Sequence, residues 1–131
     1  MNRDKLTELY KKYDLTKDDV FKHKHYLIIT RSGIEKIQAV ANIDVTYEVI
    51  KCEKDFAAVK AFGIKGDAKL ETFGSCYNAK YPIGNTQSWY VLELAEKRAM
   101  SRIVLKMTEF YKYGAMGQDE SEEFKKADNG K

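Results

Sequence analysis

The sequence predicts an α+β fold, in which an antiparallel three- to four-stranded β-meander follows a short helix and carries a long helix packed on one face. Apolar residues recur at helical spacing in some segments and alternate at strand spacing in another. The strand-like segments are joined by short polar turns. Parallel neighbours would need crossovers of about a dozen residues, so we expect the meander to be antiparallel.

Composition indicates a soluble domain. The 131 residues, 44% hydrophobic and 33% charged, suffice for one globular domain with tails. No apolar run approaches the roughly 18 residues of a membrane span, and the N-terminus MNRDKLTELYKK is too polar for a signal peptide. We therefore expect a cytoplasmic protein without a membrane partner. In a reducing compartment, Cys52 and Cys76 are expected to be small buried residues.

The chain divides into three expected regions. Residues 1–20 hold an N-terminal amphipathic helix and a connector, residues 21–114 form the core domain, and residues 115–131 form an acidic, flexible tail. The apolar face of the first helix consists of Leu6, Leu9, Tyr10 and Tyr13.

Two elements are expected before the meander. HYLIITR has the length and composition of a strand. In SGIEKIQAVAN, Ser32 and Glu35 have the spacing of a capping box, which predicts a short helix over about residues 33–41. Asn42 is the expected end of that helix.

The meander follows at once. In IDVTYEVIKC the residues alternate between apolar and polar, which predicts a strand. FAAVKAFGI and AKLETFGSC are two further strand candidates, and the polar segments EKD and KGD are the turns between them. The segment NAKYPIGNTQ contains the only proline and is expected to be a loop.

A long helix is expected from Ser88, with Gly114 as its end. At 100° per residue, one broad arc is apolar and predicts the face that covers the sheet. That arc comprises Trp89, Leu92, Ala99, Met100, Ile103, Met107, Phe110 and Tyr111.

The same helix carries a basic stripe. Arg98, Arg102 and Lys106 follow one another at intervals of four residues, and Lys97 lies off this stripe. Few acids lie on that face, so neutralisation within the helix is weak. A groove between this stripe and a sheet edge would suit a phosphate backbone, whereas a solvated helix face is the alternative. The candidate DNA-binding residues are Lys97, Arg98, Arg102, Lys106, Lys69, Lys80 and Arg31.

Four aromatic residues cluster just before and at the start of the long helix and could stack nucleic-acid bases. Core packing is the competing interpretation, and for Trp89 it is the favoured one. These residues are Tyr77, Tyr81, Trp89 and Tyr90.

The order of these elements resembles the single-strand annealing proteins of recombination, which include the Rad-fifty-two family and phage relatives of the Erf and Redβ type. That family has a short strand, a helix ending in a Leu-Ala-Asn-like step, a meander, and a long helix with a Lys-Arg-Ala step. Here YLII precedes SGIEKIQAVAN, the meander starts at IDVTYEVI, and Lys97-Arg98-Ala99 lies in AEKRAMSRIVLKMTEFY. The resemblance covers about residues 21–123.

The resemblance implies a protein of homologous recombination and DNA repair, of the phage type. Such proteins form rings or filaments, bind single-stranded DNA along a basic groove, and anneal complementary strands without nucleotide hydrolysis. Lys97 and Arg98 correspond to the cations that line the groove. The chain lacks the GxxxxGK[ST] pattern, which agrees with an ATP-independent mechanism that needs no cofactor.

Parts of the sequence also fit two other function classes. The Asp67-Ala68-Lys69 tripeptide has the Asp-x-Lys form of metal-dependent nucleases, and Asp44 or Asp55 would supply another carboxylate. A polar turn that enters a strand is the favoured interpretation of this short tripeptide, and we expect no enzyme. His23 and His25 form a HxH pair with no neighbouring acid or cysteine cluster, so no metal site is expected. The third class is a scaffold protein that forms oligomers through sheet edges and binds no nucleic acid.

Overall fold

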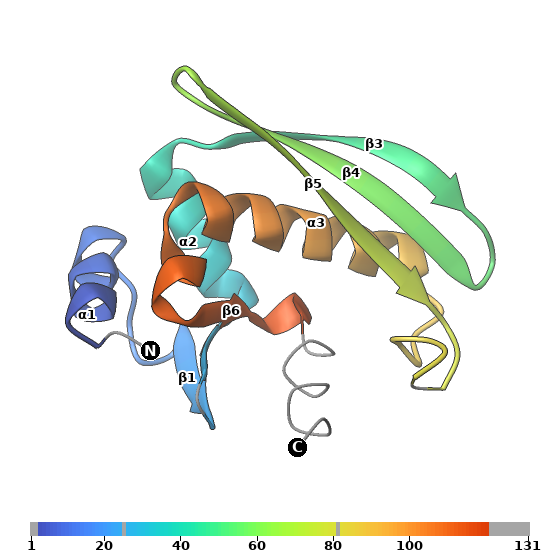
Figure 1. The fold of residues 1–131 in the computed structure, drawn as a ribbon, viewed down its shortest axis with the longest axis horizontal. Helices are drawn as coiled ribbons and strands as arrows, with labels where there is room; N and C mark the ends of the chain where they lie inside the picture. The colour runs from blue at the N-terminus through green and yellow to red at the C-terminus, as the bar shows by residue number, and fades with distance from the viewer. Residues whose placement is uncertain (1–2, 25, 81, 121–131) are drawn as a thin grey trace. The chain divides into compact units, whose positions relative to one another are not determined.

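The computed structural model describes residues 3–24, 26–80 and 82–120. The described residues form three α-helices and two three-stranded sheets, which confirms the predicted α+β class (Figure 1). The chain is organised as two compact units. Unit 1 comprises Met1–Ile43 and Val104–Lys131, and unit 2 comprises Asp44–Ile103.

Unit 1 contains the N-terminal elements and the end of the chain. Strand β1 pairs antiparallel with β2, and β2 pairs parallel with β6. Residues 115–120 were expected to start the flexible tail, but they form β6 and a turn of 3₁₀-helix; the rest of the expected tail lies outside the described residues. The elements are α1 Arg3–Lys12, β1 Val20–His23, β2 Tyr26–Ile29, α2 Arg31–Ala41, η1 Phe110–Tyr113, β6 Ala115–Gly117 and η2 Gln118–Glu120.

Helix α2 is capped by Thr30 at its start and by Asn42 at its end. The predicted capping box at Ser32 was wrong, because Thr30 is the N-cap and its side chain accepts a hydrogen bond from the Gly33 amide at 3.3 Å. Asn42 does end the helix, in the left-handed conformation with φ 54°. Its backbone N–H donates to the Ala39 and Gln38 carbonyls, which satisfies the last turn.

A buried carboxylate ties the start of unit 1's sheet to α2. Asp19 is 3% exposed and accepts hydrogen bonds from the Thr16 amide at 2.9 Å, the Ser32 hydroxyl at 2.8 Å and the Lys36 ammonium at 2.7 Å. The Lys36 bond is the largest of the effects that hold the pKa of Asp19 far below its usual range. The same bond raises the pKa of Lys36. Asp19 is therefore expected to stay ionised wherever unit 1 is folded.

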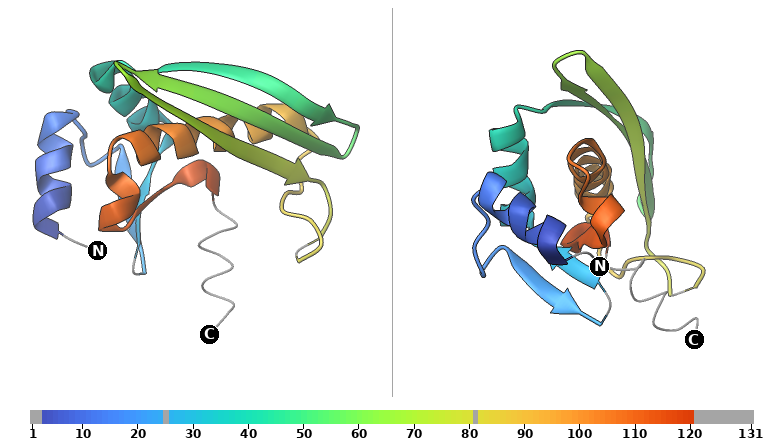
Figure 2. Two further views of the ribbon diagram at one scale, coloured as in Figure 1. Left: turned by 45° about the horizontal axis from the view of Figure 1, so that its top comes forward. Right: turned by 60° about the vertical axis from the view of Figure 1, so that its left-hand side comes forward.

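Unit 2 is the predicted meander with the long helix on one face. Strand β3, Asp44–Cys52, pairs antiparallel with β4, Phe56–Lys65, which pairs antiparallel with β5, Ala68–Tyr77. Helix α3, Val91–Met107, starts in unit 2 and ends in unit 1. Figure 2 shows α3 lying along one face of the sheet.

Small residues let α3 approach β5 closely. A Cβ added to Gly74 would lie 2.6 Å from the Ala99 backbone nitrogen, so only glycine fits under the helix there. Two residues before Gly74 on β5, the buried Thr72 hydroxyl donates a hydrogen bond to the Ala99 carbonyl at 2.7 Å. On β4, every second residue from Ala57 to Gly63 is buried against the same face. The helix therefore covers the β4–β5 side of the sheet.

The helix is shorter than the sequence predicted. It begins at Val91 rather than Ser88 and ends at Met107 rather than Gly114. Glu109 takes a left-handed conformation with φ 68°, which interrupts the helix before η1. Gly114 ends η1 instead. In the predicted apolar arc, Ala99, Met100 and Ile103 are buried, whereas Trp89 lies outside the helix and is exposed.

Candidate nucleic-acid interface

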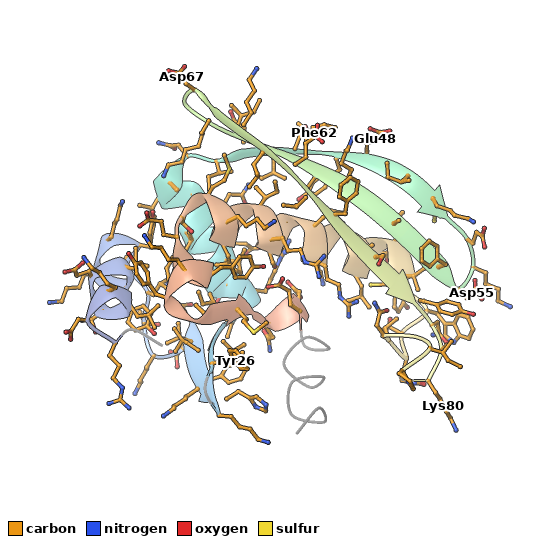
Figure 3. All side chains as sticks on the ribbon, in the orientation of Figure 1. Tyr26, Glu48, Asp55, Phe62, Asp67 and Lys80 are labelled. Atoms are coloured by element: carbon orange, nitrogen blue, oxygen red, sulfur yellow. The ribbon has the colours of Figure 1, made fainter. Side chains whose placement is uncertain are left out.

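The seven predicted cations do not form one group. Arg31 and Lys106 belong to unit 1, whereas the other five belong to unit 2. Within unit 2, Lys69 lies next to the β4–β5 turn and Lys80 follows the far end of β5. Figure 3 shows Lys80 and Asp55 at one end of the sheet and Asp67 at the other. The structure places four of the seven on α3, namely Lys97, Arg98, Arg102 and Lys106, although Lys106 belongs to unit 1.

Arg98 is buried and binds two backbone carbonyls of unit 2. The residue is only 4% exposed, although arginine is rarely buried. One guanidinium nitrogen donates to the Ser75 carbonyl at 3.0 Å, and another donates to the Asn85 carbonyl at 3.3 Å. The fork therefore joins α3 to the edge of β5 and to the loop after it. Contact between Arg98 and DNA stays a prediction, and this burial weakens it.

Arg102 continues the same pattern one turn later. It is partly exposed, and its guanidinium donates to the Phe73 carbonyl at 2.7 Å. Phe73 and Ser75 lie two residues apart on β5, so their carbonyls point to the same side of the strand. The two arginines therefore occupy the outer edge of β5, where a fourth strand would otherwise pair.

The remaining predicted cations face solvent or acids. Lys97, Lys106, Lys69 and Lys80 belong to exposed residues. Arg31 is partly buried, and its guanidinium lies 3.3 Å from a Glu35 carboxylate oxygen and 3.7 Å from one of Asp119. Arg31 therefore contributes to ion pairing within unit 1.

Aromatic side chains are exposed where the sequence favoured burial. Trp89 is 61% exposed and Tyr90 is 72% exposed, so the favoured interpretation of Trp89 as a core residue was wrong. The Lys54 ammonium lies 5.6 Å from the centre of the Trp89 ring, which places a cation beside an accessible ring face. Lys54 comes from the β3–β4 turn and was not among the predicted residues. We name Lys54, Trp89 and Tyr90 the aromatic–lysine cluster.

Hydrogen bonds hold the loop that presents this cluster. The Asn78 side-chain amide donates to the Ser88 carbonyl at 2.8 Å. The Ser88 amide donates to the Thr86 hydroxyl, and the Tyr90 amide donates to the Ser88 hydroxyl, both at 3.1 Å. Trp89 is therefore flanked by anchored backbone and needs little further ordering to bind a ligand.

More aromatic residues lie on the neighbouring part of the sheet. The Phe56 and Tyr77 rings are 6.3 Å apart and packed edge to face. Both line a shallow pocket together with Lys51, Glu53 and Asp55. The Lys51 ammonium lies 3.0 Å from a Glu53 carboxylate oxygen, so acids balance the cation within this pocket. The pocket extends the exposed aromatic surface but adds little positive charge.

The sheet face away from α3 carries a third aromatic group. Lys60 lies between Phe62 and Phe73, with its ammonium 5.1 Å and 5.6 Å from the two ring centres. Phe62 and Glu48 both lie on this face (Figure 3). The same ammonium is 3.6 Å from a Glu71 carboxylate oxygen. Acids are thus interleaved with the rings here, which suits a phosphate backbone less well than the aromatic–lysine cluster does.

The two carboxylates that could join Asp67 in a nuclease site lie at different ends of the sheet. Asp55 and Asp67 occupy turns at opposite ends (Figure 3), so they cannot share a metal. Asp44 pairs with Ile64 and lies toward the Asp67 end. His25 lies outside the described residues. Across residues 3–24, 26–80 and 82–120, no three or more histidine, cysteine, aspartate or glutamate side chains gather in a way that could hold a metal ion.

No helix among the described residues is long and apolar enough to cross a membrane. Comparisons with protein-family models, with curated proteins and with solved structures found no match to the chain. Membership of the single-strand annealing family, on which the expected role in recombination rests, therefore remains a hypothesis.

Proposed function

We propose that this chain binds single-stranded DNA at the aromatic–lysine cluster of unit 2. The observation that carries the proposal is the exposure of Trp89 and Tyr90, together with the Lys54 ammonium beside the Trp89 ring. Exposed aromatic rings that stack on bases, combined with cations that hold phosphates, are the usual features of sequence-tolerant single-strand binding. Lys80, in the same loop region, and Lys97 are exposed lysines that supply further phosphate contacts in this proposal.

Strand annealing is the activity we propose to follow from such binding. Stacking uses the faces of the bases and phosphate contacts use the backbone, so the Watson–Crick edges stay available to a second strand. This mechanism needs no nucleotide hydrolysis. It agrees with the role in phage-type recombination that the family resemblance implies, and with assembly into a homo-oligomeric ring or filament.

Titration of a fluorescently labelled dT oligonucleotide at two salt concentrations tests the proposal. Replacing Trp89 by alanine should raise the dissociation constant by roughly tenfold, because stacking contributes about 1–3 kcal/mol per base. Phe21→Ala is the matched control, since Phe21 is 43% exposed on β1 in unit 1. Binding that is absent at low salt, or that is reduced equally by both substitutions, would contradict the proposed site.

A further inference from the structure

The two edges of the unit 2 sheet differ. On β5, Arg102 and Arg98 donate to the Phe73 and Ser75 carbonyls. Asn85 binds the same edge of β5 further along. Its side-chain oxygen accepts a hydrogen bond from the Tyr77 backbone amide at 2.8 Å, and its backbone amide donates to the Tyr77 carbonyl at 3.0 Å. In the second half of β5, the Phe73, Ser75 and Tyr77 carbonyls and the Tyr77 amide are therefore hydrogen-bonded within the chain. A further strand could pair with this half of β5 only by displacing these bonds.

Strand β3 forms the other edge, and no strand lies beyond it in the part of the chain that the structure describes. Its apolar residues Val45, Tyr47 and Val49 are paired with Gly63, Ala61 and Val59 of β4, and so they lie on the α3 side of the sheet. Because α3 covers the β4–β5 side, Tyr47 stays 39% exposed and Val49 52% exposed. A long apolar edge strand of this kind is a template for strand pairing.

The pairing register shows which residues of β3 direct their backbone outward. The Phe73 carbonyl points away from β4, so the backbone of its partner Lys60 points toward β3. Glu48, which pairs with Lys60, therefore points back toward β4. Because backbone direction alternates along a strand, Val45, Tyr47 and Val49 point their N–H and C=O groups outward.

We propose that two copies of this chain pair β3 with β3, antiparallel, about a two-fold axis at Tyr47. In this register Tyr47 faces Tyr47 of the second copy, and Val45 faces Val49. The apolar residues on the α3 side then cover one another. Backbone hydrogen bonds between the two β3 strands then join two three-stranded sheets into one of six strands.

Charge selects this register over its neighbours. Shifting the pairing by one step in one direction sets Asp44 against Glu48 of the second copy, and shifting it in the other direction sets Glu48 against Glu48. Like charges directly opposite each other destabilise a strand pair. In the proposed register Glu48 faces Thr46, so no like charges meet within residues 44–49. The strand is thus complementary to a second copy of itself.

The closed edge of β5 decides the symmetry of the pair. A sheet continued from β3 of one copy to β5 of the next would need the carbonyls that Arg98 and Arg102 occupy. The pair made by β3 alone is isologous and closes after two copies. This inference does not depend on nucleic-acid binding, and a ring would require an additional contact elsewhere.

The test is the mass of the purified full chain in solution, measured by light scattering during gel filtration. The wild-type chain should elute as a dimer. Tyr47→Lys sets two ammonium groups against each other on the axis and should raise the dimer dissociation constant about a hundredfold. Thr46→Lys adds the same charge on the opposite face of the strand and is the matched control, which should stay dimeric. Circular dichroism checks that each variant is folded.

Charge exchange tests the register itself. Tyr47→Lys and Tyr47→Glu should each be monomeric, and mixing them in equal amounts should restore a dimer, because only the proposed register sets residue 47 against residue 47. A monomeric wild-type chain overturns the proposal even if a variant fails to fold. A wild-type oligomer that survives Tyr47→Lys, or folded variants that stay monomeric on mixing, overturns it as well.

Discussion

At the scale of single residues, the cations within the apolar helix α3 are explained by the backbone they bind. Arg98 and Arg102 are spaced by one helical turn, and their acceptors Phe73 and Ser75 are spaced by two strand residues. One turn of helix rises about 5.4 Å and two strand residues span about 6.7 Å, so the two repeats nearly match. Guanidinium groups that satisfy edge carbonyls stabilise unit 2 and keep β5 from pairing further.

Replacing Arg98 by lysine should destabilise unit 2. A lysine ammonium cannot span both the Ser75 and the Asn85 carbonyl as the guanidinium fork does, so one acceptor loses its partner. We expect the free energy of unfolding, measured by urea titration, to fall by about 1–3 kcal/mol. Lys97→Ala, at the exposed neighbouring position, should change it by less than about 0.5 kcal/mol. Equal effects of the two substitutions would argue against the structural role of Arg98.

The Asp19 carboxylate should make unit 1 sensitive to acid. Its folded-state pKa lies below the ordinary value of 3.8, so its contribution to stability is complete above about pH 5 and is lost as the pH falls further. Thermal unfolding between about pH 2 and pH 7 should show this decline. Asp19→Asn should lower the midpoint at neutral pH and flatten the curve at low pH. Asp18→Asn, an exposed neighbour, should leave the curve unchanged.

At the scale of elements, the contact between α3 and β5 depends on one glycine. Gly74→Ala would place a Cβ 2.6 Å from the Ala99 nitrogen, and backbone atoms cannot move aside cheaply. We expect a loss of about 1–3 kcal/mol in the free energy of unfolding, as is usual for overpacking. Ser75→Ala, on the opposite face of the same strand, is the control and should cost less. A neutral Gly74→Ala would show that α3 does not lie against β5 as described.

The elements themselves could largely be predicted from the sequence. Alternation and short turns gave the antiparallel meander, and Asn42 marked the end of α2, because these signals act within a few residues. The end of α3 was predicted too late in the chain. Glu109 adopts a left-handed conformation, which usually requires glycine, and the residue type gave no sign of it.

The candidate site was harder to predict, because it depends on contacts between distant residues. A helical arc shows that Arg98 and Trp89 lie near apolar neighbours, but it does not show which of them the sheet covers. The outcome was the reverse of the expectation, with Arg98 buried and Trp89 exposed. Lys54 belongs to no periodic or charged pattern in the sequence. Only the fold of the β3–β4 turn brings its ammonium to the Trp89 ring.

At the scale of the whole molecule, binding and pairing are proposed for different surfaces. The aromatic–lysine cluster lies at the turn and loop end of unit 2, whereas the pairing residues lie on the outer edge of β3. Tyr47→Lys should therefore leave the affinity for an oligonucleotide short enough for one copy unchanged. A short-oligonucleotide titration by fluorescence anisotropy checks this, and loss of affinity would mean that the two surfaces are coupled.

The most direct test of the central claim uses Trp89 itself, which is the only tryptophan in the chain. Titrating the protein with unlabelled dT oligonucleotide should quench its fluorescence, because bases stack on the exposed ring. The apparent affinity should fall steeply between about 50 and 200 mM salt, since lysines release counterions from the phosphates. Unchanged Trp89 emission while a labelled oligonucleotide binds would contradict the proposed site, and no binding at low salt would contradict the proposed function.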